Sequence, residues 1–506
     1  MPASSTEVKN ANVCSTGIEG LDQILRGGLP LHRFYLVQGD PGVGKTTLGL
    51  NFLLEGVKGG DKGLYITLSE THDELVEVAK SHEWDLTQIS ILELSALEET
   101  LFAEAQNTLF YPAEVELNQL AQILMERVVE VNPGRVIFDS LSELRLLAQN
   151  PLRYRRQLLA LKQFFSGRKC TVLVMDDRTS ETSDREVQSI AHGVIKLEQM
   201  APEYGESRRR ISVVKVRGAV FSGGYHDYVI RQGGLVVYPR LTAAEKQGVF
   251  PSGAASGGIP ELDQLLGGGL DRGTSTLFMG PPGTGKSTLG AQFAVAAAER
   301  GENSIVFTFD EKVETYIHRG DSIGLGVSRQ IDAGRINAIQ INPAELSPGE
   351  FANCIRAAVE EKQARVVIID SLNGYLNSMP EESFLAVQMH ELLSYLAQRG
   401  IVTILILAQN GLIGAAMQSP VDITYLADTV VILRYFEAEG TVKKAISVIK
   451  KRSGDHERTI REFAITPDGI QVGAPLNAFH GVLSGIPTFQ GQGDAPTPSQ
   501  HPHGPL

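Results

Sequence analysis

The chain carries two glycine-rich stretches of nearly the same composition, GDPGVGKTT at residues 39–47 and GPPGTGKST at residues 280–288. Both fit the spacing G-x-x-x-x-G-K-[S/T], in which glycine lets the backbone curl until successive N–H groups point at phosphate oxygens. The lysine neutralises the terminal phosphates, and the next hydroxyl binds Mg²⁺. Each stretch follows an apolar run and precedes a helical pattern, so both predict a site for ATP and Mg²⁺. The predicted ATP-binding residues are Gly42, Val43, Gly44, Lys45, Thr46 and Thr47 in the first stretch and Gly283, Thr284, Gly285, Lys286, Ser287 and Thr288 in the second.

The two stretches belong to a repeat that extends over most of the chain. Lys45 and Lys286 lie 241 positions apart, and the offset falls to 235 near the end of the repeat, so the second copy has a net deletion of a few residues. One domain has therefore been duplicated. The matching segments are TGIEGLDQILRGGLP (16–30) and SGGIPELDQLLGGGL (256–270), VIFDSL (136–141) and VIIDSL (367–372), and ISVVKVRG (211–218) and ISVIKKRS (446–453).

Each copy alternates short apolar runs with stretches of helical spacing. In the first copy the runs include FYLV at 34–37, LYITL at 64–68 and RVIFD at 135–139. Strands that alternate with helices in this way predict an α/β fold, with a mostly parallel sheet covered by helices on both faces. We therefore expect two tandem P-loop NTPase domains. The expected parts are a flexible N-terminus (1–14), a first domain (15–245), a second domain (246–490) and a disordered tail (491–506) that is rich in Pro, Gly and polar residues.

Composition and charge limit the classes of protein that fit. With 506 residues, of which 42% are hydrophobic and 21% charged, the chain is typical of a globular protein with two domains. It has no apolar run of about 18–20 residues, no signal peptide at its start and only three, widely spaced cysteines, which predicts a cytoplasmic protein without a membrane partner. The net charge of −13 disfavours nucleic acid as a partner, because nucleic-acid surfaces need a basic footprint. The basic triplet at 208–210 is explained more simply as a solvated turn.

A carboxylate ends an apolar strand in each copy. Asp139 and Asp370 each precede Ser-Leu, as expected of the aspartate that holds the Mg²⁺ shell in P-loop enzymes. A carboxylate at a strand end is also often a helix cap, but its occurrence behind both P-loops favours the metal role. The predicted metal-site residues are Thr46 and Asp139 in the first copy and Ser287 and Asp370 in the second.

Another acidic position follows a different strand of each copy. Glu70 comes after LYITLS and Glu311 after IVFTFD, and the two glutamates keep the 241-residue offset. A carboxylate at a strand end near the γ-phosphate can polarise an attacking water or hydroxyl. The alternative is an acid at a helix N-terminus, where the helix dipole favours it. We predict catalytic roles for Glu70 and Glu311.

In their order along the chain, these motifs resemble those of the clock protein KaiC and its bacterial and archaeal relatives, a family of RecA-like ATPases. The resemblance extends from about Ser15 to Phe489 and includes G-[IL]-x-x-L-D, both P-loops, D-S-L, a K-x-R strand and FHGVLSGIPTF at 479–489. It implies tandem RecA-like domains in a two-tiered homo-hexamer, with ATP between neighbouring subunits. The first tier of such rings mainly hydrolyses ATP, and the second also transfers phosphate to hydroxyls of an adjacent subunit. The resemblance further implies a signalling or clock-type role with KaiB-like or other protein partners.

The resemblance also assigns residues that reach a neighbour's nucleotide. They are Lys215 and Arg217 of the K-x-R strand in the first copy and Lys450 and Arg452 in the second. A basic pair supplied in trans would stabilise charge on the γ-phosphate and tie hydrolysis to assembly. The simpler alternative is a strand whose outward face is basic. Two further positions match nucleotide contacts, Ser81 in the first copy and His456 in the second, whereas Ile323 stands where clock members carry tryptophan.

The chain departs from the family at the catalytic pair. The family usually carries Glu-Glu, whereas the first copy here reads Ser69-Glu70 and the second Asp310-Glu311. The resemblance therefore implies a catalytic role for Asp310 beside Glu311. Loss of one carboxylate predicts slower or altered hydrolysis in the first ring. An aspartate in place of glutamate withdraws the carboxylate by about one methylene, which affects a base that needs hydrogen-bond contact.

The phosphoacceptor segment differs as well. Clock members carry adjacent Ser-Thr shortly before the Asp-Thr strand, and aligning Asp428-Thr429 places Thr424 and Tyr425 there. Thr424 can accept phosphate by the same chemistry, whereas the hydroxyl of Tyr425 lies several ångströms farther from the backbone. We therefore expect at most partial autophosphorylation, on Thr424.

Two other functions fit a duplicated P-loop chain. A RecA-like DNA motor or loader needs basic loops that face a pore, but the segment GLIGAAMQSPVD at 411–422 contains no lysine or arginine. A nucleotide-switched scaffold with little turnover would use ATP only to hold rings together.

Overall fold

The structure is a computed structural model, and the chain divides into two compact units. One comprises Met1–Arg240 with Ser347–Asn353, and the other Leu241–Leu346 with Cys354–Leu506. The predicted boundary at 245/246, the tail from 491 and the segment at 411–422 all lie outside the described residues. The described residues are 12–94, 112–148, 150–177, 187–201, 205–241, 250, 253–342, 344–377, 385–409, 424–438, 440–483 and 488–489.

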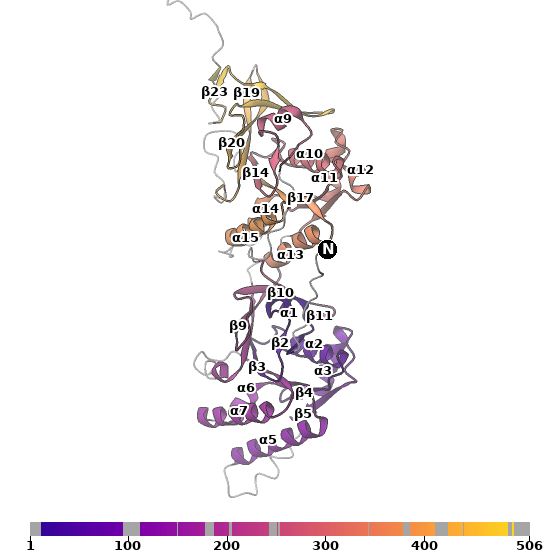
Figure 1. Cartoon of the computed structure of the whole chain (residues 1–506), viewed down its shortest axis with the longest axis vertical. Coiled ribbons are helices and arrows are strands. Elements are labelled where there is room, and N and C mark those ends of the chain that lie inside the picture. Colours follow the sequence, from indigo (N-terminus) through magenta and orange to yellow (C-terminus); the bar gives the residue numbers. More distant parts are fainter. Residues whose placement is uncertain are drawn as a thin grey trace, which may run out of the picture. The chain divides into compact units, whose positions relative to one another are not determined.

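The first unit is built on one nine-stranded sheet (Figure 1). The strand order is β11-β10-β9-β8-β3-β7-β6-β4-β5. The strands from β8 to β5 in this order run parallel, and β9, β10 and β11 are antiparallel to their neighbours. The predicted mostly parallel α/β sheet is thus confirmed here. The strands are β3 (Phe34–Gly39), β4 (Gly63–Thr67), β5 (Ile89–Glu93), β6 (Arg135–Asp139), β7 (Thr171–Asp176), β8 (Gly193–Met200), β9 (Arg208–Val216), β10 (Tyr225–Arg231) and β11 (Gly234–Tyr238).

The second unit repeats this topology. Its strand order is β16-β15-β17-β18-β14-β19-β20-β21-β22. The strands from β16 to β19 in this order run parallel, and β20, β21 and β22 are antiparallel to their neighbours. The fold therefore confirms the duplication inferred from sequence. The strands are β14 (Ser275–Gly280), β15 (Asn303–Thr308), β16 (Ile336–Gln340), β17 (Ala364–Asp370), β18 (Val402–Ala408), β19 (Thr429–Ala438), β20 (Thr441–Lys451), β21 (Arg461–Thr466) and β22 (Gly469–Pro475). Short ladders pair β1 (Val13–Cys14) with β2 (Leu29–Pro30), β12 (Ala254–Ala255) with β13 (Leu270–Asp271), and β23 (Phe479–His480) with β24 (Thr488–Phe489).

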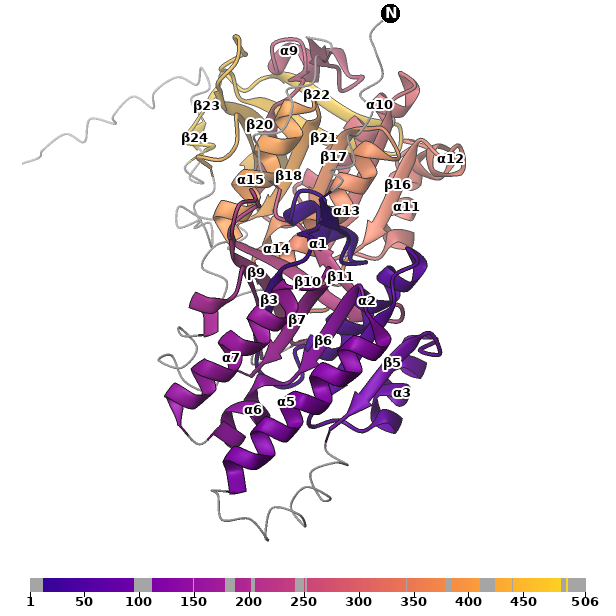
Figure 2. The same cartoon turned by 60° about the horizontal axis from the view of Figure 1, so that its bottom comes forward.

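Alternate residues of each strand point to opposite faces, so the core of the first unit has two layers. Tyr35 and Val37 of β3 belong to the layer that includes residues of α1, α2 and α3. Phe34 and Leu36 belong to the layer that includes residues of α5, α6 and α7, and Figure 2 shows α5 and α7 lying across β6 and β7. Helices thus cover both faces, as predicted. They are α1 (Glu19–Ile24), α2 (Lys45–Lys58), α3 (His72–Ser81), α5 (Pro112–Val131), α6 (Leu141–Ala148) and α7 (Pro151–Ser166).

The second unit is covered in the same way. Phe278 of β14 packs in a layer with residues of α9, α10 and α12, while α14 and α15 contact β18. Its helices are α9 (Pro260–Leu265), α10 (Lys286–Glu299), α11 (Val313–Ser322), α12 (Val327–Asp332), α14 (Leu372–Asn377) and α15 (Leu385–Gln398). The remaining helix, α13 (Pro348–Glu360), begins within the residues Ser347–Asn353 that are assigned to the first unit.

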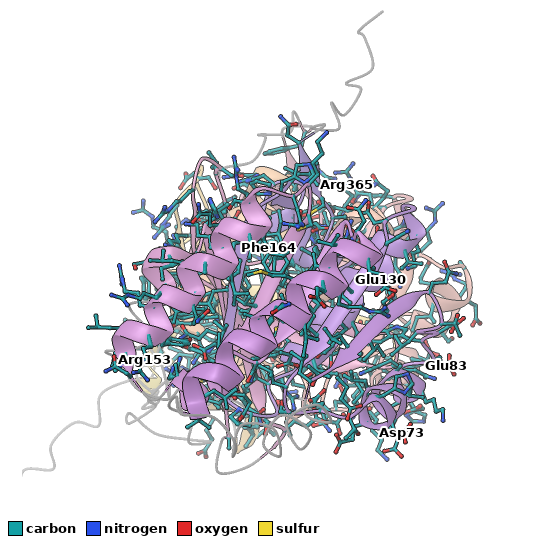
Figure 3. All side chains as sticks on the ribbon, turned by 90° about the horizontal axis from the view of Figure 1, so that it is seen from below. Asp73, Glu83, Glu130, Arg153, Phe164 and Arg365 are labelled. Atoms are coloured by element: carbon teal, nitrogen blue, oxygen red, sulfur yellow. The ribbon has the colours of Figure 1, made fainter. Side chains whose placement is uncertain are left out.

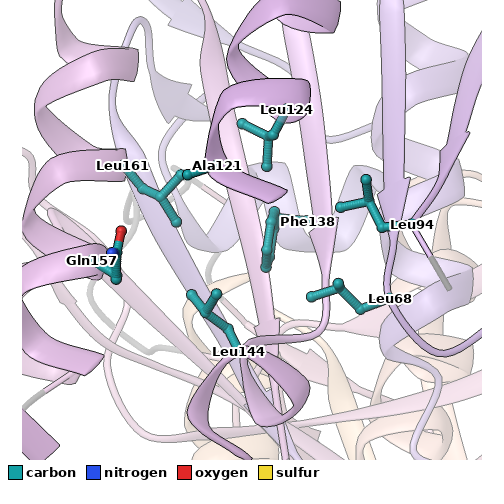
Figure 4. A pocket seen from close by; sticks show the side chains of 8 residues that line it. All are labelled: Leu68, Leu94, Ala121, Leu124, Phe138, Leu144, Gln157 and Leu161. Atoms are coloured by element: carbon teal, nitrogen blue, oxygen red, sulfur yellow. The ribbon is translucent and has the colours of Figure 1, made fainter. Parts of the chain in front are cut away.

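The exterior of the first unit is charged, and its interior layers are apolar. Asp73, Glu83 and Glu130 are exposed and point outward in Figure 3. A small pocket among β6, α5, α6 and α7 is a gap in the apolar layer on the face away from α2 (Figure 4). No helix in the described ranges has both the length and the apolarity to cross a membrane. The pocket is lined by Leu68, Leu94, Ala121, Leu124, Phe138, Leu144, Gln157 and Leu161.

Candidate nucleotide sites

Each P-loop joins the carboxyl end of a central strand to a long helix, β3 to α2 and β14 to α10. The residue before each helix is a glycine in the left-handed region, Gly44 at φ 94° and Gly285 at φ 105°. A Cβ atom on Gly44 would lie 2.6 Å from Cδ1 of Ile230, and one on Gly285 would lie 2.6 Å from Cδ1 of Ile465. Both the backbone conformation and the close approach therefore require glycine. The predicted ATP-binding residues of each stretch lie in this loop and the first helical turn, whose N–H groups suit a phosphate.

The P-loop lysine of the first site has a partner that the sequence analysis missed. The ammonium of Lys45 donates to the carbonyls of Gly39 and Asp40, both at 3.0 Å, and lies 2.8 Å from Oδ1 of Asp177. Asp177 follows β7, the neighbour of β3, and its other oxygen accepts a hydrogen bond from Ser142 at 3.0 Å. The repeat could have pointed to this residue, because MDD at 175–177 is replaced by ILA at 406–408 in the register of the second copy.

The P-loop lysine of the second site has a different environment. The ammonium of Lys286 donates to the carbonyl of Pro281 at 2.8 Å, and burial lowers its pKa to about 8. No ion pair of Lys286 occurs among the described residues. A tyrosine hydroxyl steadies each P-loop, with Tyr228 donating to the carbonyl of Val43 at 2.6 Å and Tyr435 to that of Pro282 at 3.1 Å.

The first predicted metal site is assembled from β4, the residues that follow it, the end of β6 and the start of α2. The hydroxyl of Thr46 lies 3.4 Å from Oδ2 of Asp139 and 3.3 Å from Oε1 of Glu70. Tyr65 of β4 donates to the same Oδ2 of Asp139 at 2.6 Å. Burial raises the pKa of Asp139, and the Tyr65 hydrogen bond opposes this shift. A hydroxyl and buried carboxylates beside a P-loop are the oxygen donors that Mg²⁺ prefers, so these residues fit the ion.

The second predicted metal site has the same donor set. Asp370 ends β17 and accepts a hydrogen bond from Ser287, the residue after the P-loop lysine. Burial raises the pKa of Asp370, while the Ser287 hydrogen bond and the positive charge of Arg319 lower it. Val306 stands in the register position of Tyr65, so the second aspartate has no phenol beside it at that position.

The predicted catalytic Glu70 lies next to the first metal site. Burial, with the nearby charge of Asp139, raises its pKa to about 7. Its Oε2 atom is buried and has no hydrogen-bond partner among the described residues. A carboxylate with an oxygen that no protein group occupies and a pKa near neutrality has the properties of a general base.

The predicted catalytic residues of the second site are both engaged. Arg319 of α11 donates through Nη1 to both oxygens of Glu311, at 2.6 and 2.7 Å. Ser371 donates a short hydrogen bond to Asp310. The two copies thus present their acidic residues differently, although the strands around them match.

The predicted trans-acting pair of the first copy lies away from its own P-loop. Lys215, near the end of β9, donates to the carbonyl of Gln188, and Arg217 donates to the carbonyl of Ser189 at 2.8 Å. The backbone N–H of Arg217 bonds to His192, whose own N–H bonds to Phe34 at the start of β3. The P-loop leaves from the other end of that six-residue strand, about 16–20 Å away.

The equivalent pair of the second copy holds the predicted phosphoacceptor segment. Lys450 donates to the carbonyl of Thr424 at 3.0 Å, and Arg452 donates to that of Tyr425 at 2.8 Å. Asp428, just after this segment, accepts from the N–H of Ser275 at 3.0 Å. Thr424 therefore lies near the start of β14, at the opposite end of the strand from the P-loop.

Two predicted nucleotide contacts lie apart from both P-loops. Ser81 is exposed at the end of α3, and its hydroxyl donates to the carbonyl of Val78 at 2.7 Å. His456 is half-buried after β20, and its N–H donates to the carboxylate of Asp455 at 2.9 Å. Neither bonds to a P-loop residue within the described part of the chain.

The geometry agrees with comparisons to known proteins. The chain matches the family described as "ATPase: KaiC" over residues 14–242 and 255–477. It is 26% identical over 489 residues to the "Circadian clock protein KaiC3" of Synechocystis sp., with 95% of each chain covered. It is 28% identical over 464 residues to "Circadian clock protein KaiC2" of the same organism, covering 91% of this chain and 81% of the relative. It is 25% identical over 494 residues to the "Circadian clock oscillator protein KaiC" of Synechococcus elongatus, covering 96% and 94%. Because the family match covers both copies of the repeat, the chain belongs to the KaiC family of ATPases.

Proposed function

We propose that this chain is a Mg²⁺-dependent ATPase whose two nucleotide sites are completed by neighbouring subunits of a homo-hexamer. The observation that carries the proposal is the position of the K-x-R pairs. Arg217 lies by the start of β3 and Arg452 by the start of β14, whereas the P-loops leave from the ends of these strands. Neither arginine can reach its own P-loop without unfolding the strand, so a role at a nucleotide requires a second subunit.

The residue before each K-x-R lysine supports an interface at this surface. Val214 is 46% exposed and Ile449 is 47% exposed, at equivalent positions of the two copies. Exposed apolar side chains that recur in both copies beside basic residues suit a subunit contact that is used twice.

Hydrolysis in the first site follows from the positions of Lys45, Thr46, Asp139 and Glu70. Lys45 would exchange its protein partners for the terminal phosphates, and Thr46 and Asp139 would hold Mg²⁺, which would supply charge neutralisation. Glu70 accepts a proton from the attacking water. The water oxygen bonds to the γ-phosphorus, and the bond from the γ-phosphorus to the leaving oxygen of ADP breaks. Arg217 of a neighbouring subunit balances the developing negative charge.

Phosphate transfer in the second site is proposed for Thr424 alone. The hydroxyl oxygen would bond to the γ-phosphorus of ATP held by a neighbouring subunit, ADP would leave, and the proton would pass to a carboxylate of that subunit. Tyr425 is 55% exposed, and its backbone carbonyl accepts a hydrogen bond from Arg452. Its hydroxyl lies several ångströms farther from the backbone than that of a threonine, so a site shaped for threonine would not hold it in the same way. Mapping phosphate by mass spectrometry after incubation with Mg·ATP tests this. Equal phosphate on Thr424 and Tyr425 would contradict it.

The names of the relatives favour a clock-type signalling role. We propose that this role is exercised in the cytoplasm, with KaiB-like or other regulatory proteins as partners. Turnover distinguishes such an ATPase from a scaffold that only binds nucleotide. We expect slow phosphate release from the wild type and a large loss in the Glu70→Gln, Glu311→Gln double variant. Size-exclusion chromatography should show a hexamer in Mg·ATP. A monomer in saturating Mg·ATP would rule out the proposed assembly.

A further inference from the structure

The helix after each predicted catalytic glutamate carries a different side chain at one equivalent position. α3 and α11 occupy the same place in the repeat and both contain ten residues. The hydroxyl of Ser81 donates to the carbonyl of Val78 at 2.7 Å, and that of Ser322 donates to the carbonyl of Arg319 at 2.9 Å. Val78 and Arg319 are therefore equivalent, and only the second copy has a cation there.

Arg319 occupies both oxygens of Glu311. The side chains are 30% and 21% exposed, so water screens the ion pair only in part. The guanidinium also lies 5.6 Å from the ring centroid of Tyr316, which limits its movement. It is close enough to Asp370 to affect the metal-site carboxylate electrostatically. Arg319 is thus part of the wall of the second site.

The first site lacks this arrangement. Glu70 receives one weak hydrogen bond, from Thr46 at 3.3 Å, and its other oxygen has no hydrogen-bond partner among the described residues. The apolar Val78 on α3 cannot provide one. A water that reaches the buried Oε2 of Glu70 would therefore displace no protein donor, whereas in the second site an N–H of Arg319 must be displaced first.

We infer that Arg319 is a positioning residue that restrains ATP hydrolysis in the second site by holding Glu311 away from water. This inference rests on the proposed ATPase function. During hydrolysis a water oxygen bonds to the γ-phosphorus and its proton must pass to a carboxylate. The Arg319–Glu311 pair blocks that transfer while leaving the P-loop intact, so the second ring retains ATP for longer than the first.

The test exchanges the two side chains. In a Glu70→Gln background, which leaves only the second site able to hydrolyse, Arg319→Val should raise the turnover number about tenfold with little change in KM. Arg319→Gln should act in the same direction, and Arg319→Lys should stay closer to the parent because it keeps the charge. In a Glu311→Gln background, the reciprocal Val78→Arg should slow the first site by a similar factor.

Adding Glu311→Gln to the Glu70→Gln, Arg319→Val protein should remove the gain, because Arg319 acts only through Glu311. Unchanged or lower turnover in Arg319→Val and Arg319→Gln, with binding of a fluorescent ATP analogue retained, would overturn the inference. If neither Arg319 variant folds, the Val78→Arg variant provides the test. Undiminished turnover at its first site would overturn the inference. The parent Glu311→Gln protein tests the proposed ATPase separately, since absence of phosphate release there would refute that function whatever Arg319 does.

Discussion

The ammonium of Lys45 lies 2.8 Å from the carboxylate of Asp177, at the place where a triphosphate needs its positive charge. Asp177 also acts on the metal site, because its negative charge adds to the burial that raises the pKa of Asp139. The second copy has Ala408 in the equivalent register position, and Asn373 there bonds to the backbone of Ala408 as Ser142 bonds to that of Asp177. The first site must therefore break an ion pair to bind nucleotide, and the second need not.

We predict that Asp177→Asn tightens ATP binding at the first site. The substitution releases Lys45 and removes one negative charge near the phosphates, which should be worth about tenfold in Kd, or about 1.4 kcal/mol. Titration of a fluorescent ATP analogue into the Lys286→Ala protein isolates this site. The matched change, Ala408→Asp in a Lys45→Ala background, should weaken ATP binding at the second site. Weaker binding by Asp177→Asn would instead make Asp177 a ligand of the Mg²⁺·ATP complex.

The raised pKa of Glu70 predicts a pH dependence of hydrolysis. Glu70 accepts a proton only when it is ionised, and with a pKa of about 7 the ionised fraction falls as pH decreases through neutrality. In the Glu311→Gln protein, kcat/KM should therefore be constant above about pH 8 and fall about tenfold per pH unit below about pH 6. Steady-state phosphate release between pH 5.5 and 8.5 measures the profile. A kcat/KM that does not change with pH would show that Glu70 is not the base. The rate of the protein with Glu70→Gln added gives the baseline of phosphate release.

The phenol of Tyr65 should contribute to both stability and metal binding. Tyr65→Phe removes the 2.6 Å hydrogen bond to the buried Asp139, so we expect a loss of about 1–3 kcal/mol in the unfolding free energy of the first unit. The pKa of Asp139 should rise further, and more Mg²⁺ should be needed for half-maximal turnover. Tyr316→Phe is the control, because the Tyr316 hydroxyl is buried without a hydrogen-bond partner among the described residues. Chemical unfolding measures the loss of unfolding free energy in each variant. Equal losses in Tyr65→Phe and Tyr316→Phe would contradict a stabilising role for the Tyr65–Asp139 hydrogen bond.

The repeated motifs allowed much of this fold to be predicted. A strand, a P-loop and a helix follow each other in both copies, and the periodicity of the apolar runs predicted parallel sheets with helices on both faces. The positions of Asp139 and Asp370 at the ends of strands were also predictable, because each directly follows an apolar run. Each of these features is encoded within a short segment of the chain, so it can be recognised from the sequence alone.

The differences between the two sites depend on contacts between distant segments. Asp177 meets Lys45 because β7 lies beside β3, although 132 residues separate them in the chain. Arg319 meets Glu311 because one face of α11 turns toward the end of β15. Aligning the two copies shows Val78 opposite Arg319, but only the folded structure shows that the arginine contacts Glu311, the predicted catalytic carboxylate.

The most direct test of the central claim is to mix two inactive variants. Both variants carry Glu311→Gln, so that only first sites can hydrolyse ATP. Glu70→Gln should inactivate the first site of the subunit that carries it, whereas Arg217→Ala should inactivate the first site of the neighbouring subunit. If sites lie at subunit seams, random co-assembly of the two proteins in Mg·ATP gives about a quarter of seams an intact Glu70 and an intact Arg217. We predict that phosphate release then rises well above the sum of the separate proteins. No gain in hexamers shown by native mass spectrometry to contain both chains would contradict the claim that a neighbouring subunit completes the site.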